Sequence, residues 1–336
     1  MEILINTDYG IFTTIAQMSE DELLKMMTIF LQKMYGKKKV SSTKSYIIAE
    51  GTIPICLVAH MDTVFPKPPS EVYHDQKKHV IWSPQGLGAD DRAGVFAIMK
   101  IVQEGLRPHI ILTTGEEVGA IGATMLIKVF PRAPFEIKYM IELDRQGICD
   151  CVFYDCANEE FENYVNTFGF ITAWGSFSDI SVICPKWEVA GVNLSIGYVR
   201  EHSVSEILYT KGLNNTIKNV KKMLADANNV QTFKYIPDPY RYYYPGMYSL
   251  TSFGPEDDDP DDWRWGHKLK CHKCGQEYAY NDFIEVMSKT NPLYDHLYCY
   301  NCISDDRISW CQKCGEPFEV QYTGQTVCEL CKKYKD

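Results

Sequence analysis

A histidine and an aspartate, separated by one residue, follow a short apolar run in the first quarter of the sequence. The run covers residues 55–59, and the two polar residues are His60 and Asp62. If the run forms a strand buried on both faces, its polar end reaches the carboxyl edge of the sheet, where ligands bind. The imidazole could then bind a metal ion through one nitrogen while the carboxylate holds the other N–H. A single His-x-Asp pair more commonly faces solvent without binding a metal ion, so this interpretation requires matching ligands elsewhere in the chain.

Further residues of metal-ligand type stand in separate parts of the chain. Asp90 and Asp91 lie in a glycine-rich loop that follows a predicted strand. The other residues, Glu116 with Glu117, Asp144, and His202, come after predicted strands. The two acidic pairs have a structural alternative, because carboxylates cap helix N-termini and are favourable there. The loop 86–94 matches neither common phosphate-binding fingerprint, and its acidic pair would repel a phosphate. Together, however, the groups indicate one metal site at a shared sheet edge.

The elements that must position these residues alternate between strands and helices. Apolar runs predict strands at residues 40–50, 55–59, 79–82, 109–114, 138–143 and 192–196, and helical spacing predicts helices at 23–34, 95–104, 119–129, 158–168 and 205–228. A capping box at Ser19 and Glu22 predicts the start of the first helix. Short connections between alternating elements predict an α/β fold, a three-layer, mostly parallel sheet with helices on both faces.

Residues 46–210 resemble the co-catalytic dizinc exopeptidases of the M20/M28/M42 clan. The clan includes aminopeptidases, tripeptidase-like enzymes, carboxypeptidases and N-acyl amino acid deacylases. The resemblance rests on the motifs His60-Met-Asp62, Gly88-Ala-Asp90-Asp91-Arg-Ala-Gly94 and Gly115-Glu116-Glu117, followed by Asp144 and His202.

The resemblance implies a ligand set for two metal ions. One ion would be bound by His60 and Asp144, and the other by Glu117 and His202. Asp90 would bridge the two ions. Imidazole and carboxylate ligands without thiolates suit Zn²⁺, with Mn²⁺ or Co²⁺ as alternatives.

Two further residues receive roles from the same resemblance. Asp62 would orient His60, and Glu116 would be the general base. Two cations that share a carboxylate lower the pKa of water and polarise a scissile carbonyl. A carboxylate beside that water could take its proton and pass it to the leaving amine. The resemblance also implies a cis peptide bond between Asp90 and Asp91.

The chain departs from parts of the clan in two places. The segment between Asp144 and His202 is too short for the large lid domain that many M20 members carry there, and the segment between His60 and Asp90 lacks the M42 insert. We therefore expect the compact, single-domain M28-type arrangement. An oxyanion-stabilising residue would then come from the domain itself. Tyr198 is a candidate, with ordinary packing as its alternative.

The last quarter of the chain contains a duplicated cysteine pattern. Eight of the 13 cysteines form four Cys-x-x-Cys pairs: Cys271 and Cys274, Cys299 and Cys302, Cys311 and Cys314, and Cys328 and Cys331. Thiolates at this spacing form tetrahedral zinc sites, which predicts two structural zinc ions in tandem zinc ribbons, each with four cysteine ligands. The alternative is an interleaved arrangement that joins the first pair to the third.

Composition narrows the classes of partner and compartment. The chain has 336 residues, of which 45% are hydrophobic and 23% charged, and its net charge of −10 argues against nucleic acid or an anionic membrane as a partner. The near-balance of charge in the tail favours a protein partner or self-association through the zinc ribbons. No apolar run approaches the roughly 20 residues of a membrane span, and the first residues lack the pattern of a secretion signal. We expect a cytoplasmic protein with reduced thiols.

These observations divide the chain and rank its functions. We expect a dizinc hydrolase domain at residues 1–230, a Tyr-, Pro- and acid-rich linker at 231–265, and the zinc ribbons at 266–336. The first functional hypothesis is a zinc-dependent aminopeptidase that cleaves an amide bond at the free terminus of a peptide. An N-acyl amino acid deacylase, acting on acyl-amino acids, is the second. A non-catalytic zinc-ribbon adaptor that uses the hydrolase fold for binding is the third, although such a protein would not require the complete ligand set and Glu116.

Overall fold

The computed structural model describes residues 8–238, 269–278, 283–287, 295–299, 302, 307–313, 317–328 and 331–332. The chain divides into two compact units, Met1–Pro245 and Gly246–Asp336. Within the described residues, no helix combines the length and apolarity needed to cross a bilayer.

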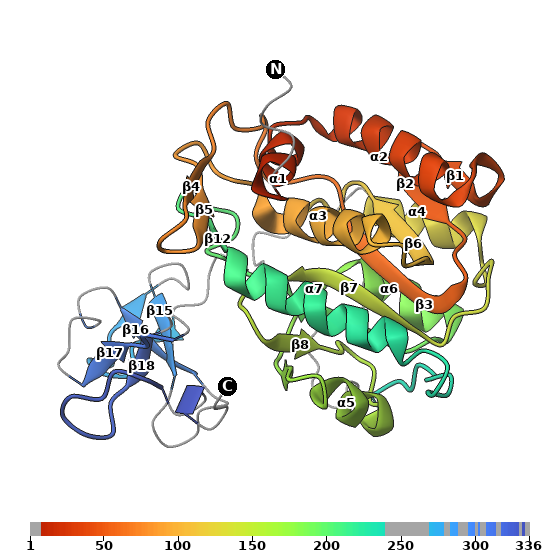
Figure 1. The fold of residues 1–336 in the computed structure, drawn as a ribbon. Helices are drawn as coiled ribbons and strands as arrows, with labels where there is room; N and C mark the ends of the chain where they lie inside the picture. The colour runs from red at the N-terminus through yellow and green to blue at the C-terminus, as the bar shows by residue number, and fades with distance from the viewer. Residues whose placement is uncertain are drawn as a thin grey trace, which may run out of the picture. The chain divides into compact units, whose positions relative to one another are not determined.

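The first unit is built on an eight-stranded sheet in the order β1-β2-β6-β3-β7-β10-β8-β9 (Figure 1). Its central strands run parallel: β6 (Pro108–Thr113), β3 (Ile53–His60), β7 (Tyr139–Arg145) and β10 (Gly191–Ser195). Antiparallel pairing adds β2 (Tyr46–Ala49) and β1 (Val40–Ser42) at one edge and β8 (Asp150–Val152) at the other, where β9 (Ile171–Thr172) follows in parallel. The predicted fold class, a mostly parallel sheet with helices, is confirmed.

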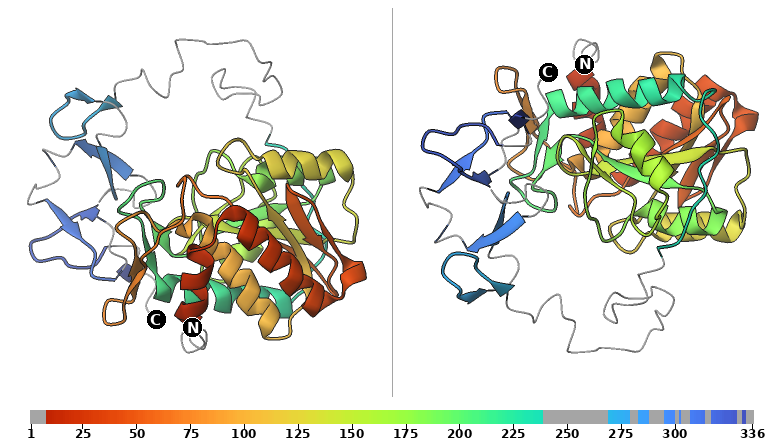
Figure 2. Two further views of the ribbon diagram at one scale, coloured as in Figure 1. Left: turned by 90° about the horizontal axis from the view of Figure 1, so that it is seen from above. Right: turned by 90° about the horizontal axis from the view of Figure 1, so that it is seen from below.

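Helices cover both faces of this sheet, because alternate strand residues point to opposite sides. In β3, Leu57 and Ala59 belong to one buried cluster, whereas Cys56 and Val58 belong to the other. The first cluster includes residues of α1 (Asp8–Ala16), α2 (Glu20–Tyr35), α3 (Ala89–Gln103), α5 (Glu159–Asn166) and α7 (Thr210–Ala225). The second includes α4 (Ile121–Val129) and α6 (Asp179–Trp187), and Figure 2 shows α4 across the sheet from α2 and α3.

A second, four-stranded sheet corrects the predicted closing helix. Residues 207–209 were predicted to be helical but form β12 (Ile207–Tyr209), and α7 begins only at Thr210. β12 pairs with β5 (Val80–Trp82) and with β11 (Tyr198–Val199), and β4 (Tyr73–Asp75) completes the sheet. The prediction was wrong here because helical spacing is a local signal, whereas β12 is fixed by pairing with a strand distant in sequence.

Other elements also differ from the sequence prediction, and strands β4, β8, β9 and β11 were not predicted. The predicted strand 40–50 is split, because the Thr43 hydroxyl accepts hydrogen bonds from the backbone N–H groups of Ser45 and Tyr46, both at 3.1 Å, and turns the chain between β1 and β2. Helix α6 was missed, and it contains Pro185, a residue that normally argues against a helix interior. Helix α1 was not predicted either.

The chain leaves the first unit later than residue 230. Lys234 and Pro237 form isolated β-bridges with Val189 and Cys156. Phe233 is 6% exposed and lies among the rings of the core. Residues 231–238, predicted as the start of the linker, are therefore packed on the first unit.

His109 should make the stability of this unit depend on pH. Its ring is buried, stacks on Phe135 with 3.9 Å between centroids, and accepts a hydrogen bond from the Gly51 N–H at 3.0 Å through Nδ1. Burial lowers the pKa of His109 from 6.5 to about 4. Between these values the unfolded chain binds a proton that the folded chain does not, so this contribution to stability is lost as pH falls through the window.

The His109→Asn variant keeps a hydrogen-bond acceptor but has no group that titrates in this pH window. Its free energy of unfolding should therefore change less with pH than that of the wild type. Urea-unfolding curves of both proteins at about pH 7 and about pH 5 measure the difference. Equal pH dependence in the two proteins would contradict the assignment.

The second unit contains a short hairpin and a small sheet. The hairpin joins β13 (Leu269–Lys270) and β14 (Glu277–Tyr278). The sheet has the order β16-β15-β18-β17, from β15 (Phe283–Met287), β16 (Asp295–Cys299), β17 (Ile308–Trp310) and β18 (Pro317–Glu319).

Candidate metal centre and active site

The predicted ligands come from strand ends and loops on one side of the first unit. His60 is the last residue of β3, Asp90 lies at the start of α3, and Glu117 follows β6. Asp144 lies within β7, which runs further than the predicted strand. His202, predicted a few residues after the strand 192–196, lies in the turn between β11 and β12.

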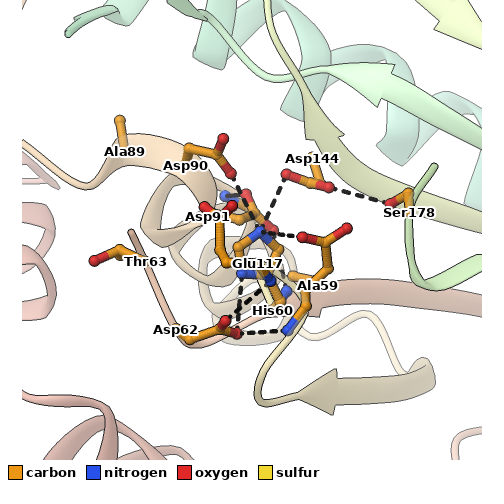
Figure 3. Close-up of polar contacts among 12 residues, drawn as sticks. Ala59, His60, Asp62, Thr63, Ala89, Asp90, Asp91, Glu117, Asp144 and Ser178 are labelled. Atoms are coloured by element: carbon orange, nitrogen blue, oxygen red, sulfur yellow. Dashed lines mark hydrogen bonds and ion pairs between the residues drawn. The ribbon is translucent and has the colours of Figure 1, made fainter. Parts of the chain in front are cut away.

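These five side chains form two groups that share Asp90. Figure 3 shows the first of them, His60 with Asp90 and Asp144. In the first, His60 Nε2 lies 3.2 Å from Asp90 Oδ1 and 3.4 Å from Asp144 Oδ1. In the second, His202 Nε2 lies 3.2 Å from Asp90 Oδ2 and 3.0 Å from Glu117 Oε2. Within each group the ligand atoms are all within 4.8 Å of one another. The two oxygens of Asp90 thus face different imidazoles, which is the geometry of a bridging carboxylate.

Asp62 connects the end of β3 to the glutamate loop. Its Oδ1 lies 3.3 Å from His60 Nδ1, as expected of a residue that orients the imidazole. Its two oxygens also accept hydrogen bonds from the backbone N–H groups of Glu116 and Glu117, both at 3.2 Å. The second pair of contacts was not foreseen from the sequence. One buried carboxylate therefore fixes both a ligand and the segment that carries the candidate base.

Glu116 lies beside the two groups without belonging to either. Its Oε2 is 4.0 Å from His60 Nε2, and its side chain is 11% exposed. The pKa of Glu116 is raised to about 9, chiefly by burial and also by the neighbouring carboxylates of Asp144 and Asp179, although His60 opposes the shift. Nearby cations favour the ionised form of such a carboxyl.

Asp91 supports the centre through hydrogen bonds to the backbone. It is fully buried and accepts hydrogen bonds from the backbone N–H groups of His60 at 3.2 Å and Gly94 at 2.8 Å. A Cβ atom on Gly94 would lie 2.3 Å from the Leu143 carbonyl oxygen, so the close approach of α3 to β7 requires glycine there. The Asp90–Asp91 peptide bond is cis, as the resemblance implies.

Glu206 was missed by sequence reasoning. Its buried carboxylate accepts hydrogen bonds from the backbone N–H groups of Ala89 at 3.1 Å and Asp90 at 3.0 Å, at the start of α3. The only sequence signal was an acidic residue soon after His202, at a position that reads as a helix start. The contact holds the backbone of the shared ligand.

Glu206→Ala should therefore weaken metal binding. Loss of a residue that orients a ligand typically costs about 10- to 100-fold in metal affinity or activity. Metal titration of the full-length variant measures the change. Glu104→Ala, which removes a more exposed carboxylate at the other end of α3, is the control. Equal metal affinity in the two variants would exclude this role for Glu206.

Tyr198 does not present a free hydroxyl to a substrate. Its ring is 2% exposed, and its hydroxyl donates a hydrogen bond to Asp144 Oδ1 at 3.1 Å. The Ser178 hydroxyl lies 3.1 Å from Asp144 Oδ2 and also contacts Glu142. Tyr198 and Ser178 thus fix the position of Asp144. The structure favours the packing role for Tyr198 over the oxyanion role, because the residue is buried and its hydroxyl is already hydrogen-bonded.

The centre fits a pair of divalent cations. Glu117 Oε1 is buried without a hydrogen-bond partner in the described structure. The pKa of Asp144 is raised to about 7, chiefly by burial and also by the neighbouring Asp90 carboxylate, although His60 opposes the shift. Because the carboxylates repel one another and an oxygen lacks a donor, cations would stabilise the group. The nitrogen and oxygen donors match zinc chemistry.

The cysteines of the second unit form two separate groups among the described residues. Cys271, Cys274 and Cys302 lie together, as do Cys311, Cys328 and Cys331, with the sulfur atoms of each group within 4.8 Å of one another. The side chains of Cys299 and Cys314 lie outside the described residues. This grouping is the one expected of sequential modules, since the interleaved alternative would place Cys311 with Cys271 and Cys274.

No family model matches the sequence, and no curated protein does so either. Solved structures do resemble the first unit. The aminopeptidase PepT from Bacillus cereus is 16% identical with a TM-score of 0.53, and the match covers 66% of this chain and 98% of that one. A Staphylococcus aureus tripeptidase is 14% identical with a TM-score of 0.53, and the match covers 66% of this chain and 98% of that one. An aminopeptidase from Desulfurococcus kamchatkensis is 14% identical with a TM-score of 0.52, and the match covers 65% of this chain and 94% of that one. The chain thus has the fold of these aminopeptidases, in agreement with the clan that its motifs resemble.

Proposed function

We propose that the first unit is a co-catalytic dizinc aminopeptidase. The observation that carries the proposal is the placement of Asp90, whose two oxygens each face one histidine, with Glu116 beside the shared group. His60 and Asp144 would hold one ion, and Glu117 and His202 the other. The fold shared with aminopeptidases supports the same reaction class.

The bound ions would polarise the scissile carbonyl and lower the pKa of water. Glu116 would take the proton of the attacking water and deliver it to the leaving amine. Asp62 would keep His60 in one tautomer and fix the backbone of Glu116, so that the base stays in position. The second unit would hold two structural zinc ions, because closed thiolate sites stabilise a fold rather than catalyse.

Substrate assays separate the aminopeptidase from the alternatives. The metal-loaded full chain should hydrolyse aminoacyl-anilides and leave N-acetyl amino acids intact. The reverse result would establish the deacylase. Failure on a broad panel of both would favour the zinc-ribbon adaptor. Metal analysis should find about four zinc ions per chain, of which the two at the open centre exchange readily.

Location and assembly form part of the same proposal. The chain would act in a reducing, cytoplasmic compartment, because paired cysteines at the spacing of the tail suit metal ligation rather than disulfides. The compact arrangement would be that of the M28 type. The zinc-ribbon unit would mediate contact with a protein partner or a second copy. Fractionation of cells and light scattering of the purified chain test these points.

A further inference from the structure

A buried glutamate lies beside the ligand Asp144 and belongs to neither ligand group. Glu142 precedes Asp144 by two residues on β7, so the two side chains extend from the same face of the sheet. Glu142 is 0% exposed, and the buried cluster on this face includes Met140 and Val58, its partner on β3. A carboxyl group in such apolar surroundings is costly unless its oxygens have hydrogen-bond partners.

One hydroxyl group joins the two carboxyls. Ser178 Oγ is within hydrogen-bond distance of Glu142 Oε2 and lies 3.1 Å from Asp144 Oδ2, the contact drawn in Figure 3. Glu142 Oε1 has no partner among the described residues. The other oxygen of Asp144, Oδ1, faces His60 Nε2 at 3.4 Å. Ser178 therefore contacts the oxygen of Asp144 that does not face the histidine.

The Ser178 hydroxyl can donate to only one of the two carboxyls, because it carries a single proton. If Glu142 also carries a proton, it donates to Ser178 Oγ, and Ser178 donates to Asp144 Oδ2. Each contact then has one donor and one acceptor. The opposite assignment would protonate a metal ligand, and ligands must be deprotonated. With neither carboxyl protonated, two buried negative charges would share one donor.

Asn193 fixes the backbone of the same ligand. Its side-chain Oδ1 accepts a hydrogen bond from the Asp144 N–H at 2.9 Å, and its Nδ2 donates to the Asp144 carbonyl oxygen at 3.0 Å. Asn193 is 1% exposed and pairs with Glu142 across β10 and β7. Because the backbone of Asp144 is held, the contacts to its two carboxylate oxygens set the rotation of the side chain.

We propose that Glu142 is a positioning residue that acts through Ser178. It donates a hydrogen bond to the hydroxyl, which in turn donates to Asp144 Oδ2 and leaves Oδ1 as the ligand oxygen. The inference rests on the proposed dizinc function and adds a residue outside both ligand groups. A carboxylate can bind an ion with one oxygen or with two, and a catalytic ion needs a position for water or substrate. Holding Oδ2 keeps that position open.

Two substitutions at Glu142 separate a hydrogen-bond donor from a negative charge. The test uses full-length proteins whose exchangeable ions are replaced by Co²⁺. Glu142→Gln keeps the shape and an N–H donor, so its Co²⁺ affinity and visible absorption should match the wild type. Glu142→Leu has no donor and should bind Co²⁺ about 10- to 100-fold more weakly, the usual cost of losing a group that orients a ligand. Its absorption, which depends on the coordination of the ion, should change.

Two further variants complete the series. Ser178→Ala removes the hydroxyl itself and should match Glu142→Leu, so it carries the test if the leucine variant does not fold. Thr216→Val is the matched control, because it removes a buried hydroxyl that donates to the Ser195 carbonyl rather than to a ligand. The control should bind Co²⁺ as the wild type does.

Equal loss of Co²⁺ affinity in Glu142→Gln and Glu142→Leu would overturn the inference, because charge rather than donation would then matter. Wild-type affinity in both Glu142→Leu and Ser178→Ala would overturn it as well. These measurements need no turnover. If the wild type hydrolyses no anilide but the variants rank as expected, the proposed function fails and the inference stands. Hydrolysis by Glu142→Leu with wild-type kcat and wild-type Co²⁺ affinity has the opposite meaning.

Discussion

Glu116→Gln should abolish turnover while the protein keeps its metal ions. General-base catalysis contributes about 10²- to 10⁴-fold, and glutamine cannot accept the proton of water. Glu116 lies outside both ligand groups, 4.0 Å from His60 Nε2, so its replacement leaves the ligands in place. Metal analysis and kcat on an aminoacyl-anilide measure the two effects separately.

Glu159→Gln makes the same change at an exposed glutamate at the start of α5 and should behave as wild type. A Glu116→Gln protein with near wild-type kcat would remove the assignment of the base. Loss of metal together with activity would instead make Glu116 a ligand.

Asp90→Asn should release both exchangeable ions. Each oxygen of Asp90 serves one group, so an amide leaves one ion without its shared oxygen and weakens the charge that holds the pair. Since residues that merely orient a ligand are worth about 10- to 100-fold, loss of the shared ligand should cost more than about 100-fold in activity.

Metal analysis after dialysis against a weak chelator distinguishes this residue from the ligands of one group. The Asp90 variant should retain only the zinc held by the cysteine clusters, whereas Glu117→Gln should lose mainly one exchangeable ion. An Asp90→Asn protein that keeps both exchangeable ions would show that the carboxylate does not bridge them.

The sequence could indicate that these residues lie together, as the structure places them, because each stands in a short motif next to a strand or helix end. Parallel topology then places such ends at one edge, which is why His60, Asp144 and Glu117 could be grouped before any coordinates. His202 was grouped with them although its turn lies between two strands that were not predicted.

The supporting contacts could not be predicted, because they join segments distant in sequence. Glu206 reads locally as the beginning of a helix, and only the fold reveals that it accepts hydrogen bonds from α3. The hydrogen bond from Tyr198 to Asp144 depends in the same way on pairing between β11 and β12. Helix α6 was not predicted because it contains Pro185, and the predicted strand 40–50 is split by the turn at Thr43.

The hairpin of β11 and β12 has a mechanical consequence. Tyr198 lies on the first strand of the hairpin and donates a hydrogen bond to Asp144 of the first ligand group. His202 lies in the turn of the hairpin and belongs to the second ligand group. Any displacement of this one hairpin is transmitted to both halves of the centre at once. The two proposed ions would thus be coupled through the scaffold as well as through Asp90, so that loss of one should weaken the binding of the other.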